Sequence, residues 1–288
     1  MEKVLISVMT YPTLSESYYE TVCTAGFRED GSWVRIFPVP HRLMRLQEEK
    51  AYAYSKWQWI EVDLVHRPEK DDRPESYRIK NIDTLKLGTR ISTKANGWSK
   101  RWQYVKKNKV IYTNMSDLIQ LAKDNKLSLA VLKPNQIDDV VCEKYTEEDI
   151  AKHKKKLSDL QTKYKAELTQ LFLWDDENHL SEHFKFAEKI PYKFSYKFLT
   201  DDGKWRTLMI EDWEIVELYR NCINGGDSEQ VACQKVRDKY MKIANECDIF
   251  LFLGTVYKWQ KMNGTNPFVI IGVFYPPKGT SQQLSLDF

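Results

Sequence analysis

Cysteine is scarce in this chain, and its few cysteines have no paired spacing. The five cysteines are odd in number and include no C-x-x-C motif; they are Cys23, Cys142, Cys222, Cys233 and Cys247. This pattern argues against a disulfide framework and against a thiolate zinc site. We therefore expect reduced thiols and neither a metal nor another cofactor.

Other signals are missing as well. No apolar run approaches the length of a membrane span, and the first residues are too polar for a secretory signal. The Gly225-Gly226 and Gly254-Thr255 pairs lack the lysine and the spacing of a phosphate-binding loop. These absences predict a cytoplasmic protein that does not enter a membrane and has no P-loop.

Two weak metal patterns are present. His179-Leu180-Ser181-Glu182-His183 matches the H-x-x-E-H motif, but no long helix precedes it and nothing indicates a third ligand. The acidic run near Asp71 and Asp72 lacks the E-x-K or D-x-K pattern of a metal-dependent nuclease. We interpret both as chance matches.

The composition is that of a globular protein large enough to bury a core. Of its 288 residues, 42% are hydrophobic and 30% are charged. Short β-rich runs dominate the first half, and Asp30-Gly31 predicts the turn of a hairpin over residues 18–40. A capping box at Thr146 begins the clearest helix, which we expect to connect two halves.

The second half predicts the order ββααββ. Asp202-Gly203 indicates another hairpin turn, two amphipathic helices follow, and residues 249–253 and 268–275 are apolar like strands buried on both faces. We therefore predict an α+β protein with a barrel-like first half and a compact second half joined by a long helix. The predicted parts are a domain at 1–145, a connector at 146–185, a domain at 186–280 and a tail at 281–288.

Positive charge clusters locally although the net charge is only +3. Basic and aromatic residues interleave in the segment 94–109, where cations suit phosphates and aromatic rings suit unpaired bases. The loop with Arg67 and Arg73 would extend this surface. An amphipathic helix with inward-facing Trp side chains explains the segment equally well. The predicted contacts in it are Lys94, Trp98, Lys100, Arg101, Trp102, Lys106 and Lys107.

Cys23 lies in the first strand of the 18–40 hairpin, and His41 follows the second. A nucleophilic thiol needs a lowered pKa, and His41 is a possible activator. No signature of a known cysteine enzyme surrounds Cys23, however, and free cysteine is most often a core residue. We favour the core interpretation and keep Cys23 and His41 as the alternative catalytic pair.

The last six residues resemble the peptide by which bacterial polymerases and repair factors bind the β sliding clamp. Gln283 offers amide hydrogen bonds, and Leu284, Leu286 and Phe288 provide apolar anchors. A tail that folds back on the core is the competing interpretation. The resemblance implies a bacterial or phage source.

The segments YETVCTAGF, DGSWVRIFPVP, IEDWEIVELYRNC and NPFVIIGVFYPP resemble an uncharacterised bacterial family associated with defence-related genes. The resemblance transfers no functional residue. Together these observations predict a nucleic-acid-associated protein of a bacterial DNA-processing or phage-defence system, with DNA or RNA as its partner. The alternatives are a cysteine-dependent enzyme acting on a nucleotide or modified base, and a pure interaction module.

Overall fold

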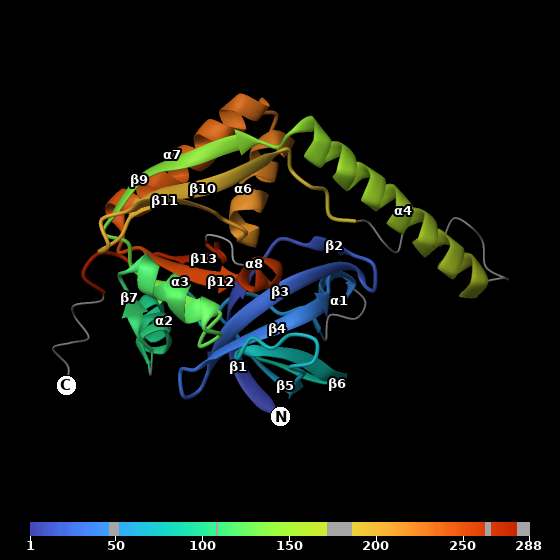
Figure 1. Ribbon diagram of the computed structural model, residues 1–288, viewed down its shortest axis with the longest axis horizontal. Helices are drawn as coiled ribbons and strands as arrows, with labels where there is room; N and C mark the ends of the chain where they lie inside the picture. Colours follow the sequence, from blue (N-terminus) through green and yellow to red (C-terminus); the bar gives the residue numbers. More distant parts are fainter. Residues whose placement is uncertain (46–51, 108, 172–185, 263–265, 281–288) are drawn as a thin grey trace.

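The computed structural model describes residues 1–45, 52–107, 109–171, 186–262 and 266–280. Within these residues the chain forms seven helices and thirteen strands in three sheets, which confirms the predicted α+β class. The sheets are stacked: a barrel, a four-stranded sheet in the middle, and a three-stranded sheet covered by helices (Figure 1).

The N-terminal part is a closed barrel of five strands. They follow one another around it in the order β1-β5-β6-β4-β3, and β3 pairs back with β1. β4 and β6 run parallel, and the other neighbours run antiparallel. The strands are β1 (Glu2–Met9), β3 (Tyr19–Arg28), β4 (Trp33–Pro40), β5 (Gln58–His66) and β6 (Ser76–Arg90).

This order and these directions are those of an OB-fold, a small Greek-key barrel. Short β2 (Thr13–Ser15) pairs with the edge of β3, and α1 (His41–Arg45) follows β4. The predicted barrel-like first half is therefore confirmed. The Asp30-Gly31 turn also lies where it was predicted, with Gly31 at a φ of 89°.

Alternating side chains give the barrel strands two apolar faces. Val4 and Ile6 of β1 face the interior, whereas Leu5 and Val8 belong to a second cluster outside the barrel. Gly26 allows close contact between strands, because a Cβ atom there would lie 2.2 Å from the carbonyl oxygen of Leu5. The barrel is thus filled inside and also packed against a partner layer.

That partner layer is the four-stranded sheet β13-β12-β8-β7. Every residue of β12 and β13 is buried. Phe252 contacts Phe27 and Trp33 of the barrel, and Phe274 contacts Trp57, while the opposite face packs into the largest core cluster. The strands are β7 (Ile111–Tyr112), β8 (Leu129–Leu132), β12 (Phe250–Thr255) and β13 (Phe268–Phe274).

The third layer is the sheet β11-β10-β9 with helices on its outer side (Figure 1). The predicted order ββααββ appears as β10, β11, α6, α7, β12 and β13, with the two strand pairs in different sheets. The elements are β9 (Gln136–Lys144), β10 (Tyr192–Leu199), β11 (Trp205–Met209), α6 (Trp213–Asn224) and α7 (Glu229–Glu246). Three further helices are α2 (Gly97–Lys106), α3 (Met115–Lys123) and α8 (Tyr257–Lys261).

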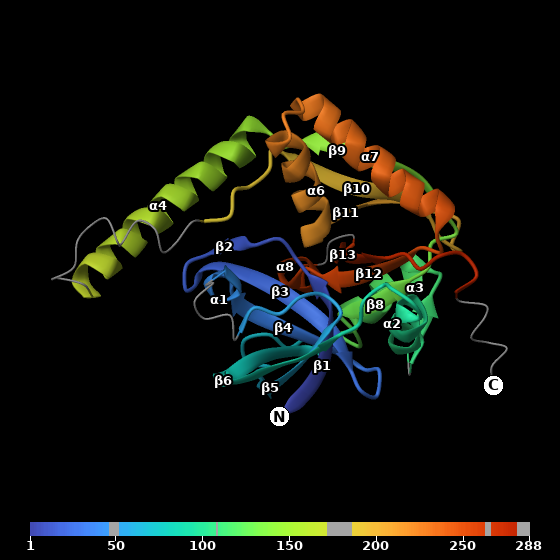
Figure 2. The same cartoon turned by 180° about the vertical axis from the view of Figure 1, so that it is seen from behind.

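The long connecting helix is α4 (Glu147–Leu171). Its first turn is capped as predicted, since the Asp149 N–H donates to Thr146 Oγ1 at 3.1 Å. From the three-stranded sheet it runs outward past the edge of the barrel near β2 (Figure 1; Figure 2). Lys156 donates to the Leu14 carbonyl and Lys163 to the Glu16 carbonyl, each at 3.1 Å, and these bonds attach α4 to the barrel.

Strand pairing crosses the predicted domain boundary at residue 145. β8 pairs with β12, and β9 pairs with β10, so both precede the boundary but join later strands. The division of the chain at residue 145 stays a prediction. None of the helices in the described ranges is long and apolar enough to span a membrane.

Candidate nucleic-acid interface

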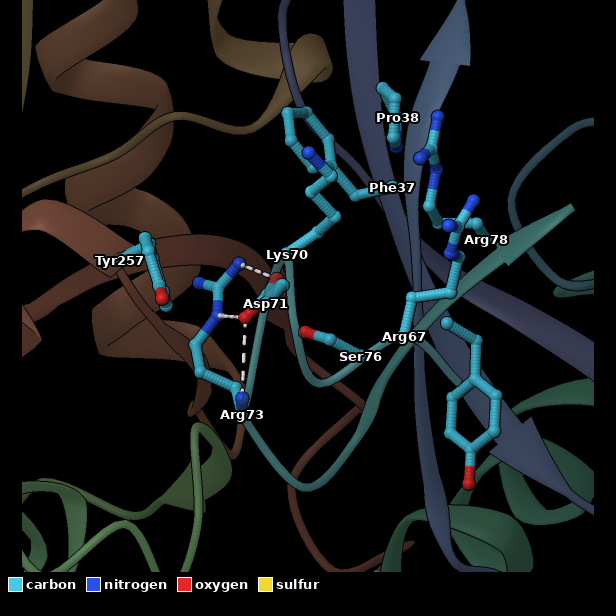
Figure 3. A pocket seen from close by; sticks show the side chains of 10 residues that line it. Phe37, Pro38, Arg67, Lys70, Asp71, Arg73, Ser76, Arg78 and Tyr257 are labelled. Carbon is cyan, nitrogen blue, oxygen red and sulfur yellow. Dashed lines mark hydrogen bonds and ion pairs between the residues drawn. The ribbon is translucent and has the colours of Figure 1, made fainter. Parts of the chain in front are cut away.

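A pocket of about 250 Å³ opens at the rim of the barrel, where the β5–β6 loop meets α8 (Figure 3). We call it the rim pocket. Three segments that are distant in sequence form its walls: the end of β4, residues 67–78, and the start of α8. Its lining side chains are Phe37, Pro38, Arg67, Lys70, Asp71, Arg73, Ser76, Tyr77, Arg78 and Tyr257.

The β5–β6 loop is held by its own backbone and by Arg73. The N–H groups of Lys70 and Asp71 both donate to the Arg67 carbonyl, at 2.9 and 3.0 Å, and this forms the turn. The Arg73 guanidinium donates two hydrogen bonds to the Asp71 carboxylate, at 2.8 and 2.6 Å (Figure 3), and one to the Thr255 carbonyl at 2.7 Å. Arg73 therefore anchors the loop to the end of β12.

This geometry changes the role expected for Arg73. Only 5% of the residue is exposed, and its bonds to Asp71 and Thr255 engage all three guanidinium nitrogens. We predicted a phosphate contact here, but the placement makes Arg73 a positioning residue. Arg67 is exposed, and its surface pair with Glu69 at 2.7 Å is weak enough to exchange for a phosphate.

Two aromatic rings are partly exposed at the rim pocket. Phe37 is 37% exposed and Tyr257 is 38% exposed, and the Arg73 guanidinium lies over the Tyr257 ring at 5.3 Å. At the pairs Val22–Val39 and Thr24–Ile36, β4 contains one residue more than β3. Phe37 has the same parity on β4 as Trp33, which points out of the barrel, so its side chain points outward too, and the extra residue returns Val39 to the interior.

Positive charge surrounds these rings. Arg67, Lys70 and Arg78 line the pocket together with Arg73, and Asp71 is the one carboxylate among the lining residues. Arg78 donates to the Tyr18 hydroxyl at 2.6 Å, which fixes its direction. Lys70 forms no ion pair with any residue in the described ranges. The pocket therefore combines apolar rings with a net positive rim.

A buried polar network supports the pocket from behind. Arg35 of β4 is 2% exposed and donates to the Ser128 hydroxyl at 2.7 Å and to Ser76 Oγ at 3.2 Å. Glu75 accepts from the Ser128 N–H and from its hydroxyl. Burial, followed by the nearby Arg73 charge, lowers the pKa of Arg35 to about 10, so the guanidinium remains charged at neutral pH.

The structure does not bring Cys23 and His41 together. Cys23 lies on the outer face of β3 with Ala25 and Phe27. Glu20 lies on the opposite face of the strand, where it forms a hydrogen bond with His41. His41 Nδ1 is 3.0 Å from Glu20 Oε2, and both side chains are almost fully buried. Burial raises the pKa of the half-buried Cys23 thiol, against smaller opposing effects of Arg35 and Arg73. This is the opposite of an activated nucleophile.

The predicted segment 94–109 is mostly helix α2, and its tryptophans pack inward. Trp102 is 5% exposed, and its ring centroid lies 4.6 Å from that of Phe250. Trp98 is half-buried against Phe274, at 5.8 Å. Arg101 is 6% exposed and lies over the rings of Trp57 and Trp98. The exposed side chains of the segment include Lys94, Lys100 and Lys107, and Lys106 is half-exposed.

The remaining predicted residues fall elsewhere. The tail residues Gln283, Leu284, Leu286 and Phe288 and the H-x-x-E-H match at 179–183 lie outside the described residues. Within the described part of the chain, no group of three His, Cys, Asp or Glu side chains is placed to hold a metal ion. The sequence analysis missed Phe37, Lys70, Arg78 and Tyr257. Phe37 lay in the quoted VRIFPVP run, but nothing local marked it as exposed.

Comparison with protein families divides the chain in two. Residues 1–107 match a family described as a domain of unknown function (DUF8758), and residues 111–287 match another domain of unknown function (DUF8757). The second match covers more than half of the chain, so the protein belongs to the DUF8757 family. No curated protein matches the sequence. The division between the two matches follows the end of α2.

Proposed function

We propose that this protein binds single-stranded nucleic acid at the rim pocket, in a bacterial DNA-processing or phage-defence system. The observation that carries the proposal is the pairing of the partly exposed Phe37 and Tyr257 rings with the cationic β5–β6 loop. Aromatic rings stack on unpaired bases of any sequence, and Lys and Arg neutralise the phosphates between them.

The position of the pocket on the barrel supports the same proposal. OB-folds bind oligonucleotides on the face of their second and third strands and with the loop between their fourth and fifth. Here those parts are β3, β4 and residues 67–75. A fold alone does not establish a function, so the side chains at this position of the barrel carry the proposal.

The size of the rim pocket suits a single base of a longer strand and is small for a whole ligand. Pockets for whole small molecules span roughly 300–1,000 Å³, and the rim pocket measures about 250 Å³. The middle sheet also covers most of the outer face of β3 and β4, through the contacts of Phe27 and Trp33 with Phe252. We therefore infer that a strand would cross the rim and insert a single base.

The test is fluorescence anisotropy with a labelled twenty-nucleotide oligo-dT and its RNA counterpart, at 50 to 300 mM salt. Binding should weaken steeply with salt because phosphate contacts release counterions. The double variant Phe37→Ala with Tyr257→Ala should weaken binding at least tenfold, since stacking contributes about 1–3 kcal/mol per base. Trp205→Ala, which removes a 46% exposed ring from β11, is the matched control. Absent or salt-independent binding would reject the proposal.

Recruitment by the β sliding clamp is the second part of the proposal. It is supported by the resemblance of residues 283–288 to clamp-binding peptides. A pull-down with purified clamp should recover the intact chain and lose the Gln283→Ala, Leu284→Ala double variant. Equal recovery of both proteins would exclude this tail as the clamp contact.

A further inference from the structure

A second pocket, of about 400 Å³, lies where the barrel, α2 and the C-terminal layers meet. We call it the junction pocket. It is remote from the rim pocket: Ser76 at the start of β6 lines the rim pocket, and Arg90 at the end of the same fifteen-residue strand lines the junction pocket. The two pockets also lie at opposite ends of the middle sheet. Tyr257 of the rim pocket follows β12 and Tyr275 of the junction pocket follows β13, and these two strands run antiparallel.

The junction pocket has more cationic side chains around it than carboxylates. Arg90, Lys94 and Arg101 line it, and none of them forms an ion pair with another residue in the described part of the chain. The fourth cation, Lys56, is already neutralised, with its Nζ 2.8 Å from an oxygen of buried Asp212. The one lining carboxylate, Glu214, lies 3.4 Å from Lys56. Asp212 and Glu214 together offset two of the four cations, so two positive charges remain in excess for an anionic ligand.

Arg101 is buried and held in one orientation, which distinguishes this site from a cluster of mobile surface cations. The residue is 6% exposed, and its Nε and Nη2 atoms both donate to the Ile91 carbonyl, at 3.0 and 2.6 Å. Its guanidinium is held above the Trp57 ring at 4.8 Å and the Trp98 ring at 5.4 Å. Burial, and then the Arg90 charge, lowers the pKa of Arg101 to about 10. Glu214 favours the charged form of Arg101 but offsets only part of these two effects, and an anionic ligand would offset more of them.

An aromatic wall adjoins the cations. The Trp98 and Tyr275 rings are 5.5 Å apart, both residues are half-buried, and both line the pocket. A planar heteroaromatic ring could lie against this wall while a phosphate reaches the three cations. Cations alone would suit any anion, whereas the wall selects an anion attached to a ring.

The start of α2 lies beside the pocket. Its N-cap residue, Asn96, makes no side-chain capping bond, and its first turn contains no acidic residue. Only glycine fits at position 97, because a Cβ atom there would lie 1.8 Å from the Ser92 carbonyl oxygen. This close approach brings Ser92, Thr93 and Lys94, which also line the pocket, to the positive end of the helix.

We propose that the junction pocket binds a nucleoside phosphate, with the phosphate at Arg90, Lys94 and the start of α2 and the base against Trp98 and Tyr275. The volume of about 400 Å³ falls within the roughly 300–1,000 Å³ of small-molecule sites. Two sources offer this chemistry: a free nucleotide, and the 5′-phosphorylated end of a strand. The site is independent of the rim pocket and would persist if that pocket bound nothing.

Calorimetric titration with the four nucleoside monophosphates tests the proposal on the full chain. At least one should bind, and the double variant Arg90→Glu with Lys94→Glu should lose at least tenfold in affinity. Lys100→Glu is the matched control, since Lys100 is exposed on α2 but does not line the pocket. Trp98→Leu should weaken nucleotide binding while leaving inorganic pyrophosphate binding unchanged. Circular dichroism melting verifies that each variant is folded.

Short oligonucleotides distinguish the two sources. A hexamer with a 5′-phosphate that binds tenfold tighter than its 5′-hydroxyl form, with this preference lost in the double charge variant, assigns the pocket to a strand end. Tighter binding of the free nucleotide assigns it to a small molecule, and both outcomes support the site. The proposal is overturned if neither ligand binds, or if the Arg90→Glu, Lys94→Glu protein binds as the unmodified chain does.

Discussion

Arg35 of β4 donates to both oxygens of Ser128, the residue immediately before β8: Nη1 to the hydroxyl at 2.7 Å and Nη2 to the carbonyl at 3.0 Å. The bonds join a barrel strand to the middle sheet. Since Arg35 also donates to Ser76, which lines the rim pocket, the same side chain fixes the pocket to the interface between the layers.

Replacing Arg35 by Met should destabilise the whole protein. The change removes three hydrogen bonds in a buried site and leaves their acceptors without the guanidinium. Losing one member of such a network costs about 2–4 kcal/mol. Urea unfolding at pH 7 measures the effect. Arg67→Met, which breaks only an exposed pair, should change stability by less than about 0.5 kcal/mol, and a similar loss in both variants would contradict this account.

Asp202 should make stability fall in acid. Bonds from Arg206, and also from Ser116 and Thr200, hold the pKa of its carboxyl well below the usual range. Because the folded pKa lies below the unfolded value of about 3.9, this stabilisation is present above pH 4 and is lost as pH falls further. Asp202→Asn should lower stability at pH 7 and flatten the decline between about pH 4 and pH 2. An unchanged acid decline in urea titrations would refute the assignment.

Mild oxidation should join Cys142 and Cys233. These free thiols of β9 and α7 have their sulfur atoms 2.6 Å apart. Diamide should form one intramolecular disulfide, detected by mass spectrometry without reduction, and Cys142→Ser should abolish it. Burial raises the pKa of both thiols, so few thiolates form and the reaction should be faster at pH 9 than at pH 7. The cross-link should stabilise the fold by at most about 4 kcal/mol.

Cys23 should resist alkylation in the native protein. Its raised thiol pKa and partial burial leave little reactive thiolate near neutral pH. Iodoacetamide at pH 7.5, followed by peptide mapping, should label Cys23 much more slowly in the native protein than in urea. Equally fast labelling in both states would revive the hypothesis of a cysteine enzyme.

Local sequence signals predicted the elements that depend on neighbouring residues. The two Asp-Gly hairpins, the capped α4 helix and the ββααββ order all appear. The fifteen-residue length of β6 was not predicted, because Lys80, Asn81 and Asp83 interrupt its apolar pattern. α8 was missed, since five residues after a strand give too short a pattern to detect.

The pairing of strands that lie far apart in the chain could not be predicted from the sequence. Barrel closure depends on β3 returning to β1, and the middle sheet depends on β8 meeting β12 about 120 residues later. Of the residues that line the rim pocket, only Arg67 and Arg73 were predicted from the sequence. Phe37 and Tyr257, which complete it, are separated by most of the chain, and their exposure depends on how the layers pack around them.

The burial of β12 and β13 on both faces has a practical consequence for producing this protein. Cutting the chain between the two family regions, near residue 109, would leave Phe27, Trp33 and Trp57 facing water on one fragment. The other fragment would expose Phe252 and Phe274. Exposed apolar surfaces of this kind cause aggregation. We therefore expect either fragment to accumulate in inclusion bodies when expressed alone, and uncut protein to be the form suited to purification.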